Sequence, residues 1–114
     1  MKHLVVAALL ILATVGSIES AELTRITMYT RAECPNKYTS SGKEPQIGFC
    51  AVSRDIEKKH RLKFGDVIHV KGVGVYRFMD RTATWIKNTV DIFHLSRHEA
   101  LEFGAPRKQI RIIR

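Results

Sequence analysis

The chain has 114 residues, and 19 Lys and Arg against 11 Asp and Glu give it a formal net charge of +8. This length suits one domain, and a composition with 45% hydrophobic residues, seven glycines and three prolines excludes a disordered or collagen-like chain. The basic balance favours an anionic partner such as an acidic polymer, a nucleic acid or an anionic membrane, and it specifies no fold.

Residues 1–21 have the pattern of a secretory signal peptide. Lys2 supplies a positive start, an apolar stretch runs from Leu4 to Val15, and small residues suited to signal peptidase follow. The apolar stretch is shorter than the roughly 18 residues that a membrane-spanning helix needs, although an uncleaved anchor remains the alternative. We predict cleavage after Ser20 or Ala21. The remaining domain, residues 22–114, is then secreted or periplasmic, without a stable membrane anchor.

The rest of the chain has mostly the pattern of strands. Alternation and β-branched residues predict strands at 23–30, 48–53, 67–71, 73–79, 89–93 and 109–113, with a long surface loop over 31–46. A charged segment at 55–62 predicts a short helix or turn. Ser96 and Glu99 form a capping box that starts a clear helix, which Gly104 and Pro106 end. Six short strands and one or two short helices predict a mainly β domain, a small closed or nearly closed barrel.

The two cysteines, Cys34 and Cys50, lie at the ends of the predicted surface loop. In an exported domain a disulfide would pin that loop, and a bond of this loop length is worth roughly 3 kcal/mol in the chain-entropy model. The spacing argues against a structural zinc site, and a catalytic thiol would lack an evident base. We therefore predict a disulfide between Cys34 and Cys50.

Histidines and basic residues give no clear site. His94 and His98 have the spacing of a helical metal pair, but Ser96 as N-cap leaves His94 outside the helix, so we predict no metal and no cofactor. The basic stretch 58–63 is interpreted as a solvated face, with attraction to an anionic wall polymer as the alternative. Signatures of nucleic-acid-binding folds are missing, so no nucleic acid partner is predicted. We expect a monomer.

Aspartates at the ends or in the middle of strands are the candidate functional residues. Asp91 interrupts the apolar strand Val90–Phe93, and Asp80 ends another strand beside Arg81. One interpretation is a pair of structural carboxylates held by Arg77 or Arg81. The other is a groove that holds one ionised and one protonated carboxylate for acid–base chemistry.

Several separated segments stand in the order of a known family: Gly48–Asp55, Met79–Arg81, Val90–Phe93 and Glu99–Gly104. Together they resemble the three-aspartate (3D) domain of membrane-bound lytic transglycosylase A and the stationary-phase muralytic proteins, over residues 26–113. The resemblance implies a six-stranded double-psi β-barrel and assigns the three aspartates to Asp55, Asp80 and Asp91. Asp91 also looks like the aspartate of the HFD motif in expansins.

Two positions depart from the family pattern. Many members have A-V-D-P where this chain has Ala51–Asp55, which displaces the first aspartate. Many also have a glycine-containing D-T-G-G-A-I-K-G segment. Here Asp80 is followed by Arg81, and no glycine lies between Asp80 and Lys87. The chain looks like a branch of the family with D-R at this place.

The resemblance implies non-hydrolytic cleavage of the glycan strand of peptidoglycan. Asp91 would protonate the glycosidic oxygen and then take the proton of the sugar's 6-hydroxyl, with Asp80 as its closest carboxylate partner and Asp55 as an orienting group. Thr27 and Tyr29 match a T-x-Y pattern of the first strand, and the segment with Thr39, Ser41 and Gly42 matches a T-A-S-G loop. Trp85, which could stack on a sugar or simply anchor the rim, and Lys87 complete the predicted ligand-binding set. The alternative function is a non-catalytic, expansin-like barrel that binds cell-wall glycan.

Overall fold

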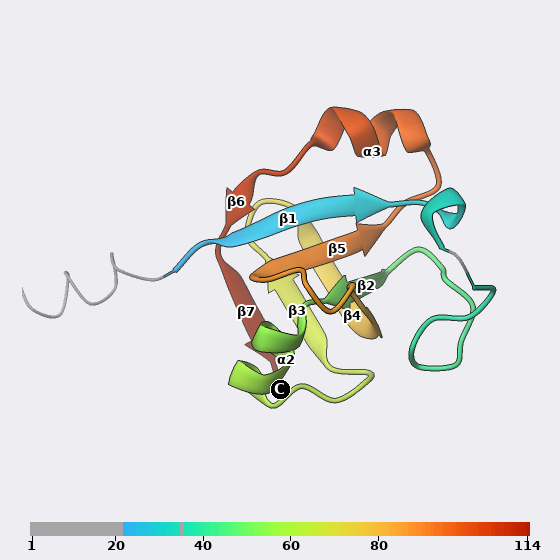
Figure 1. Cartoon of the computed structure of the whole chain (residues 1–114). Coiled ribbons are helices and arrows are strands. Elements are labelled where there is room, and N and C mark those ends of the chain that lie inside the picture. Colours follow the sequence, from blue (N-terminus) through green and yellow to red (C-terminus); the bar gives the residue numbers. More distant parts are fainter. Residues whose placement is uncertain (1–21, 35) are drawn as a thin grey trace, which may run out of the picture.

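Seven strands, two helices and a short 3-10 helix make up the described part of the chain, residues 22–34 and 36–114 of a computed structural model (Figure 1). In chain order the elements are β1 (Thr24–Tyr29), η1 (Arg31–Glu33), β2 (Phe49–Val52), α2 (Arg54–His60), β3 (Val67–Val70), β4 (Gly74–Arg81), β5 (Thr89–Phe93), α3 (Arg97–Phe103), β6 (Arg107–Lys108) and β7 (Ile110–Ile113). The predicted signal peptide lies outside the described residues. Within them, no helix combines the length and the apolar character needed to cross a bilayer.

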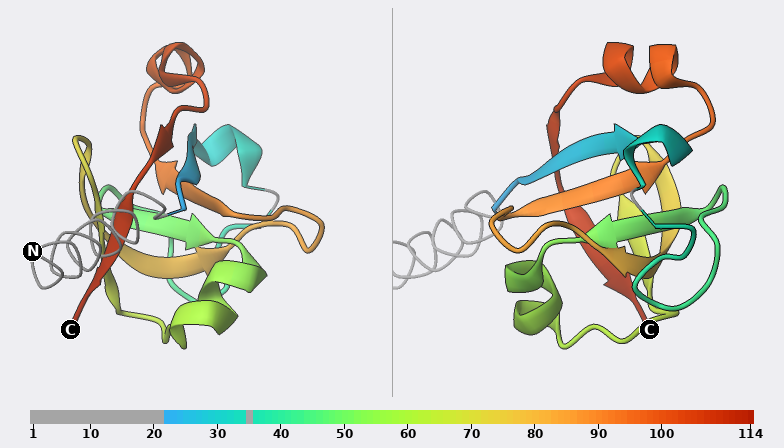
Figure 2. Two further views of the ribbon diagram at one scale, coloured as in Figure 1. Left: turned by 90° about the vertical axis from the view of Figure 1, so that its left-hand side faces the viewer. Right: turned by 45° about the vertical axis from the view of Figure 1, so that its right-hand side comes forward.

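The strands form one sheet in the order β6-β1-β5-β2-β4-β3-β7. β1 pairs with β5 and β2 with β4 in parallel, whereas β2 and β5, at the middle of the sheet, are antiparallel. The two outermost strands, β6 and β7, follow each other directly in the chain, so the sheet curls until its edges meet in a nearly closed barrel (Figure 2). At this seam Ile26 donates to the Pro106 carbonyl, and Lys71 donates to the Gln109 carbonyl.

The prediction of a mainly β, nearly closed barrel with short helices is confirmed, but the strand count differs. The last predicted strand, 109–113, is β7, and a two-residue strand, β6, precedes it and pairs with β1. Two residues carry no alternation, so no pattern could predict β6. The helix after Ser96 is α3, and the Ser96 hydroxyl accepts a hydrogen bond from the Glu99 N–H at 3.2 Å.

The core fills the inside of the barrel with the inward-facing residues of each strand. Ile26, Val52, Phe78, Val90 and Ile92 are all buried there. Because side chains alternate along a strand, the residues between them face outward, and Asp91 lies between the two core residues of β5. Burial of each large apolar side chain stabilises the fold by about 1.5–3 kcal/mol.

A second, smaller apolar cluster lies on the outer face at the carboxyl ends of β1 and β5. It consists of Tyr29, Ala51 and Phe93, with Cys34 packed against it. The rings of Tyr29 and Phe93 meet edge to face, with centroids 5.4 Å apart. The segment between η1 and β2 runs along this end of the barrel (Figures 1 and 2).

Both cysteines are free thiols in the structure, so the predicted Cys34–Cys50 disulfide is not formed. The two residues belong to different clusters. Cys50 points into the barrel core, whereas Cys34 packs on the outer face against Tyr29 and Phe93. A disulfide needs two Cβ atoms about 3.5–4.5 Å apart and directed toward each other, and side chains on opposite faces of a sheet do not meet that need.

The burial of Cys50 predicts a protected thiol. Its side chain is fully buried, and burial together with the nearby charge of Asp91 raises its pKa to about 12. A thiol reagent at neutral pH should therefore leave Cys50 unmodified in the native protein, and denaturation without reductant should expose two reactive thiols per chain. Mass spectrometry of the labelled chain measures both. If the denatured, non-reduced chain took up no label, the result would show that Cys34 and Cys50 are joined by a disulfide after all.

Candidate active site

Four residues of four neighbouring strands form a row across the outer face of the sheet. Thr27 pairs with Asp91, Asp91 with Ala51, and Ala51 with Asp80. Adjacent strands lie about 4.8 Å apart, so the two aspartate Cα atoms are separated by two strand spacings, about 10 Å. The residue between them is Ala51, whose methyl side chain leaves space above β2.

An irregularity in the pairing of β2 with β4 brings Asp80 into this row. Cys50 pairs with Phe78, but the next residue, Ala51, pairs with Asp80, so Met79 is skipped. With strict alternation Asp80 would lie on the same face as Phe78, in the core. The shift, of the kind that a β-bulge produces, puts it on the outer face with Asp91.

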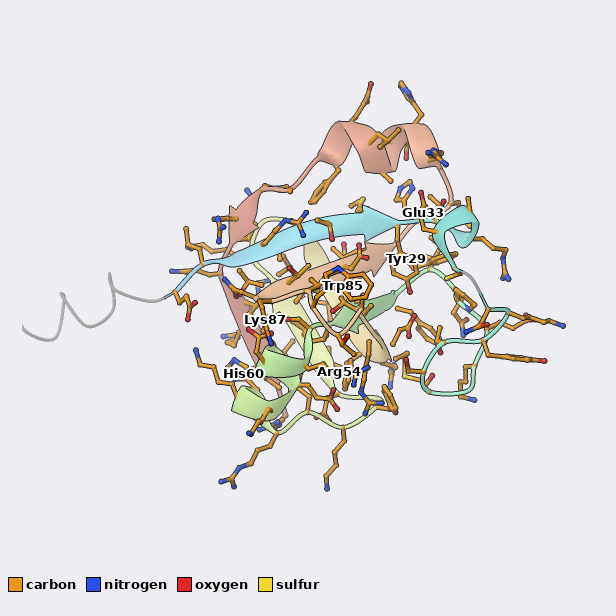
Figure 3. The ribbon with its side chains drawn as sticks, viewed as in Figure 1. Tyr29, Glu33, Arg54, His60, Trp85 and Lys87 are labelled. Atoms are coloured by element: carbon orange, nitrogen blue, oxygen red, sulfur yellow. The ribbon has the colours of Figure 1, made fainter. Side chains whose placement is uncertain are left out.

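A cleft of about 540 Å³ opens over this row. Its floor includes Ala51, Asp80 and Asp91, and two segments form its walls, one after β1 and one after β4. Figure 3 shows Tyr29 and Glu33 together at the carboxyl end of β1. The lining residues that sit on the walls are Tyr29, Glu33, Cys34, Asn36, Tyr38, Thr39, Ser40, Arg81, Thr82, Ala83 and Ile86.

Asp91 has the properties of a general acid. Burial raises its pKa to about 6, against the opposing effects of a hydrogen bond from Thr27 and of the charge of Arg25, and the negative charges of Glu33 and then Asp80 add to the rise. The Thr27 hydroxyl donates to Asp91 Oδ1 at 2.8 Å. A carboxyl group with a pKa of about 6 can both give and take a proton near neutral pH.

The Asp80 carboxylate accepts hydrogen bonds that fix the loop containing Ser40. Its Oδ1 accepts from the Ser40 N–H at 2.9 Å, from the Ser40 hydroxyl at 2.8 Å and from the Arg81 N–H at 2.8 Å. Among the described residues its Oδ2 contacts only the Tyr29 hydroxyl, at 3.5 Å, which is a weak contact. Asp80 therefore connects β4, at the floor of the cleft, to the 39–42 loop.

Arg81 follows Asp80 but directs its charge away from the row. Its Nε and Nη2 donate to the two carboxylate oxygens of Glu57 at 2.8 and 2.9 Å, and its guanidinium lies 4.6 Å from the centre of the Phe64 ring. This bidentate pair is with α2, and neither Arg77 nor Arg81 makes an ion pair with Asp80 or Asp91 in the described residues. The interpretation of the aspartates as structural partners of these arginines is thus not supported.

Asp55, the third predicted aspartate, lies apart from the cleft. Both of its carboxylate oxygens accept from the Asn88 N–H, at 3.1 and 3.0 Å, and it lines a different, smaller cavity beside α2. Burial pushes its pKa up, but hydrogen bonds from Ser53 and Asn88 outweigh that effect and leave the pKa below its usual value. Asp55 holds the turn before β5, and the structure does not bring it to Asp80 and Asp91.

The remaining predicted ligand-binding residues divide into two groups. Tyr29 and Thr39 line the cleft, while Ser41 and Gly42 support it from behind: the Ser41 hydroxyl lies 2.7 Å from that of Thr39, and Gly42 donates to the Thr39 carbonyl. Trp85 and Lys87 lie on the segment between β4 and β5 with exposed side chains outside the cleft lining, and Trp85 is 79% exposed (Figure 3).

Glu33 is the charged cleft residue that the sequence prediction missed. It is the last residue of η1 and belongs to a capping box with Thr30, the residue that follows β1. The signal for it was present, because a Thr followed three residues later by a Glu is the pattern of a helix N-terminus. Among the described residues no group of three or more His, Cys, Asp or Glu is arranged to hold a metal ion.

No protein-family model and no curated protein matched this chain.

The raised pKa of Asp91 predicts a pH-dependent cost in stability. An unfolded aspartate has a pKa near 3.9, so ionisation between about pH 4 and pH 6 disfavours the folded state and the loss stays constant above pH 6. An Asp91→Asn variant avoids this loss and keeps an acceptor for Thr27. Its unfolding free energy should match that of the wild type near pH 4 and exceed it by up to about 3 kcal/mol at pH 7.5.

Denaturant unfolding of both proteins at several pH values between 4 and 7.5 measures this difference. All other titrating groups are common to the two chains, so their effects cancel. A difference that did not change with pH would show that Asp91 ionises as easily in the folded as in the unfolded chain.

Proposed function

We propose that this protein is a lytic transglycosylase-like enzyme that cleaves the glycan strand of peptidoglycan. The observation that carries the proposal is Asp91, a carboxyl group of raised pKa on the floor of an open cleft, with no basic side chain paired to it in the described residues. Tyr29 and Tyr38 add aromatic surface to the cleft wall, and hydroxyl and amide groups of Asn36, Thr39 and Ser40 offer hydrogen bonds. Sugars are commonly bound by such mixtures of aromatic and polar groups.

We also propose that the barrel is of the double-psi type and belongs with the three-aspartate domains. Two parallel pairs, β1 with β5 and β2 with β4, joined by antiparallel pairing of β2 and β5, support this assignment. So does the position of Asp91 on β5, the strand that carries the family's VDIF-like segment. The protein would act outside the cytoplasm as a monomer, after removal of residues 1–21.

The proposed reaction uses Asp91 twice. Its carboxyl proton passes to the glycosidic oxygen, the bond from that oxygen to the anomeric carbon breaks, and the electron pair stays on the departing sugar. The 6-hydroxyl oxygen of the remaining sugar then bonds to the anomeric carbon, and its proton returns to the Asp91 carboxylate. The product ends in a 1,6-anhydro ring, no water is consumed, and Asp91 is again protonated for the next cycle.

A non-catalytic, expansin-like glycan-binding barrel is the second candidate. It is favoured by the separation of the three aspartates, because Asp80 holds the 39–42 loop and Asp55 lies at another cavity. Of the three aspartates, only Asp91 is then available for proton transfer. Both candidates use the same cleft and differ in whether the bound glycan is cut.

We expect purified wild-type protein to release anhydro-muropeptides from peptidoglycan, as detected by mass spectrometry. An Asp91→Asn variant, of equal shape, should remain folded and lose this release by about 100-fold or more, since the proton donor is removed. Asp80→Asn should lose less, because its main contacts are with the loop. Circular dichroism checks the fold of each variant.

Two outcomes would contradict the proposal in different ways. Full activity of Asp91→Asn would remove Asp91 as the acid. Wild-type protein that binds peptidoglycan in a pull-down experiment but releases no anhydro-muropeptides would establish the binding-module function instead.

A further inference from the structure

Glu33 stands at the cleft because of a short, well-defined piece of backbone. A single residue, Thr30, separates the end of β1 from the start of η1, so the last residue of η1 lies near the carboxyl end of the parallel pair β1 and β5. The Thr30 N–H donates to Glu33 Oε2 at 2.8 Å, and the Thr30 hydroxyl donates to the same oxygen. These two bonds hold the carboxylate in one orientation at the cleft wall (Figure 3).

The Glu33 carboxylate is ionised, and only one of its two oxygens accepts the hydrogen bonds from Thr30. The hydroxyl and then the backbone N–H of Thr30 favour the ionised form and hold its pKa below the usual value. Both of those bonds go to Oε2. The other oxygen, Oε1, has Arg97 Nη1 at 4.0 Å, which is beyond hydrogen-bond distance, and the Glu33 side chain is 44% exposed. Oε1 can therefore accept a hydrogen bond from a ligand in the cleft.

Glu33 and Asp80 are the two carboxylates whose charges act on Asp91. Oδ1 of Asp80 accepts three hydrogen bonds, two from Ser40 in the loop and one from the Arg81 N–H. The negative charges of Glu33 and of Asp80 both add to the raised pKa of Asp91.

We propose that Glu33 is the second substrate-contacting carboxylate of the cleft, the ionised counterpart of the protonated Asp91. This inference rests on the proposed function: as the glycosidic bond breaks, positive charge develops on the anomeric carbon and ring oxygen of the sugar, and a fixed negative charge beside that ring stabilises it. Glu33 forms no bond and transfers no proton.

The charged and titratable groups around Asp91 come from three strands and from η1 and the residue after it. They are Arg25 and Tyr29 on β1, Glu33 and Cys34 at η1, Cys50 on β2, and Asp80 on β4. Burial raises the pKa of Tyr29 and of both thiols, so these three stay neutral near pH 6. The charges that act on Asp91 are then those of Arg25, Glu33 and Asp80.

The kinetic test compares Glu33→Gln with a matched control, Glu44→Gln. Glu44 lies in the same segment before β2, is 51% exposed and pairs with Lys37 at 3.4 Å, but it does not line the cleft. For the release of anhydro-muropeptides, kcat of Glu33→Gln should be at least about tenfold lower than that of wild type, with little change in KM. The reason is that the lost interaction exists mainly in the transition state. Glu44→Gln should behave as wild type.

The pH profile separates a charge effect from a loosened η1. Activity needs protonated Asp91, so it declines as the pH rises past the pKa of that group. Without the negative charge of Glu33 that pKa falls, and the declining limb should move to lower pH in Glu33→Gln. Thr30→Val disturbs the same capping box but keeps the charge, so its limb should stay closer to that of the wild type.

NMR titration of the Asp91 carboxyl carbon gives a readout that needs no activity. We expect a lower midpoint in Glu33→Gln than in wild type, and an unchanged midpoint in Glu44→Gln. An inactive wild type would defeat the proposed function, while this shift would still support the pairing of the two carboxylates. An Asp91 midpoint unaffected by Glu33→Gln, or a kcat equal to that of Glu44→Gln, would overturn the inference.

Discussion

The skipped residue in the pairing of β2 with β4 determines what the outer face of this barrel can do. Because Ala51 pairs with Asp80 and not with Met79, a carboxylate that strict alternation would direct into the core lies beside the row of Thr27 and Asp91. The cost of an ionised group among Phe78 and Ile92 is thereby avoided. The same shift places Asp80 where it can reach the 39–42 loop, so the floor of the cleft and one of its walls depend on a single feature of strand register.

Carboxylates that accept backbone N–H groups hold the loops of this protein. Asp80 holds Ser40, Asp55 holds Asn88, Asp66 holds Lys63, and Glu33 holds Thr30. Such bonds to an ionised acceptor are stronger than those between neutral groups, and each satisfies a donor that a loop would otherwise leave unpaired. In a chain with only 11 acidic residues, several of them are committed in this way. Asp91 differs, because its bond comes from the hydroxyl of Thr27 and its surroundings raise its pKa.

Local sequence patterns predicted most of the helices and strands. They could not predict the register in which strands distant in the sequence pair. Alternation of apolar residues located β5 to the residue, and the capping box of Ser96 located α3. The same alternation gave Asp91 its outward face, but it could not predict the shift that brings Asp80 alongside, since a bulge depends on the partner strand. The disulfide expectation was wrong for the structure because sequence distance does not tell which face of a sheet a cysteine occupies. Glu33 was within reach of the pattern rules, and Asp55 was assigned to the site by resemblance only.

The charge of the whole protein and the environment of Asp91 act on that carboxyl group in opposite directions. A net charge of +8 favours the ionised form and by itself would lower the pKa. Exposed charges are screened over about 8 Å at physiological ionic strength, however, and the guanidinium of Arg81, the residue after Asp80, is paired with Glu57. Burial, and the charges of Glu33 and Asp80, act at short range where screening is weak. The local effects therefore prevail, and a protein of high positive net charge can contain a cleft whose acid is still about half protonated near pH 6.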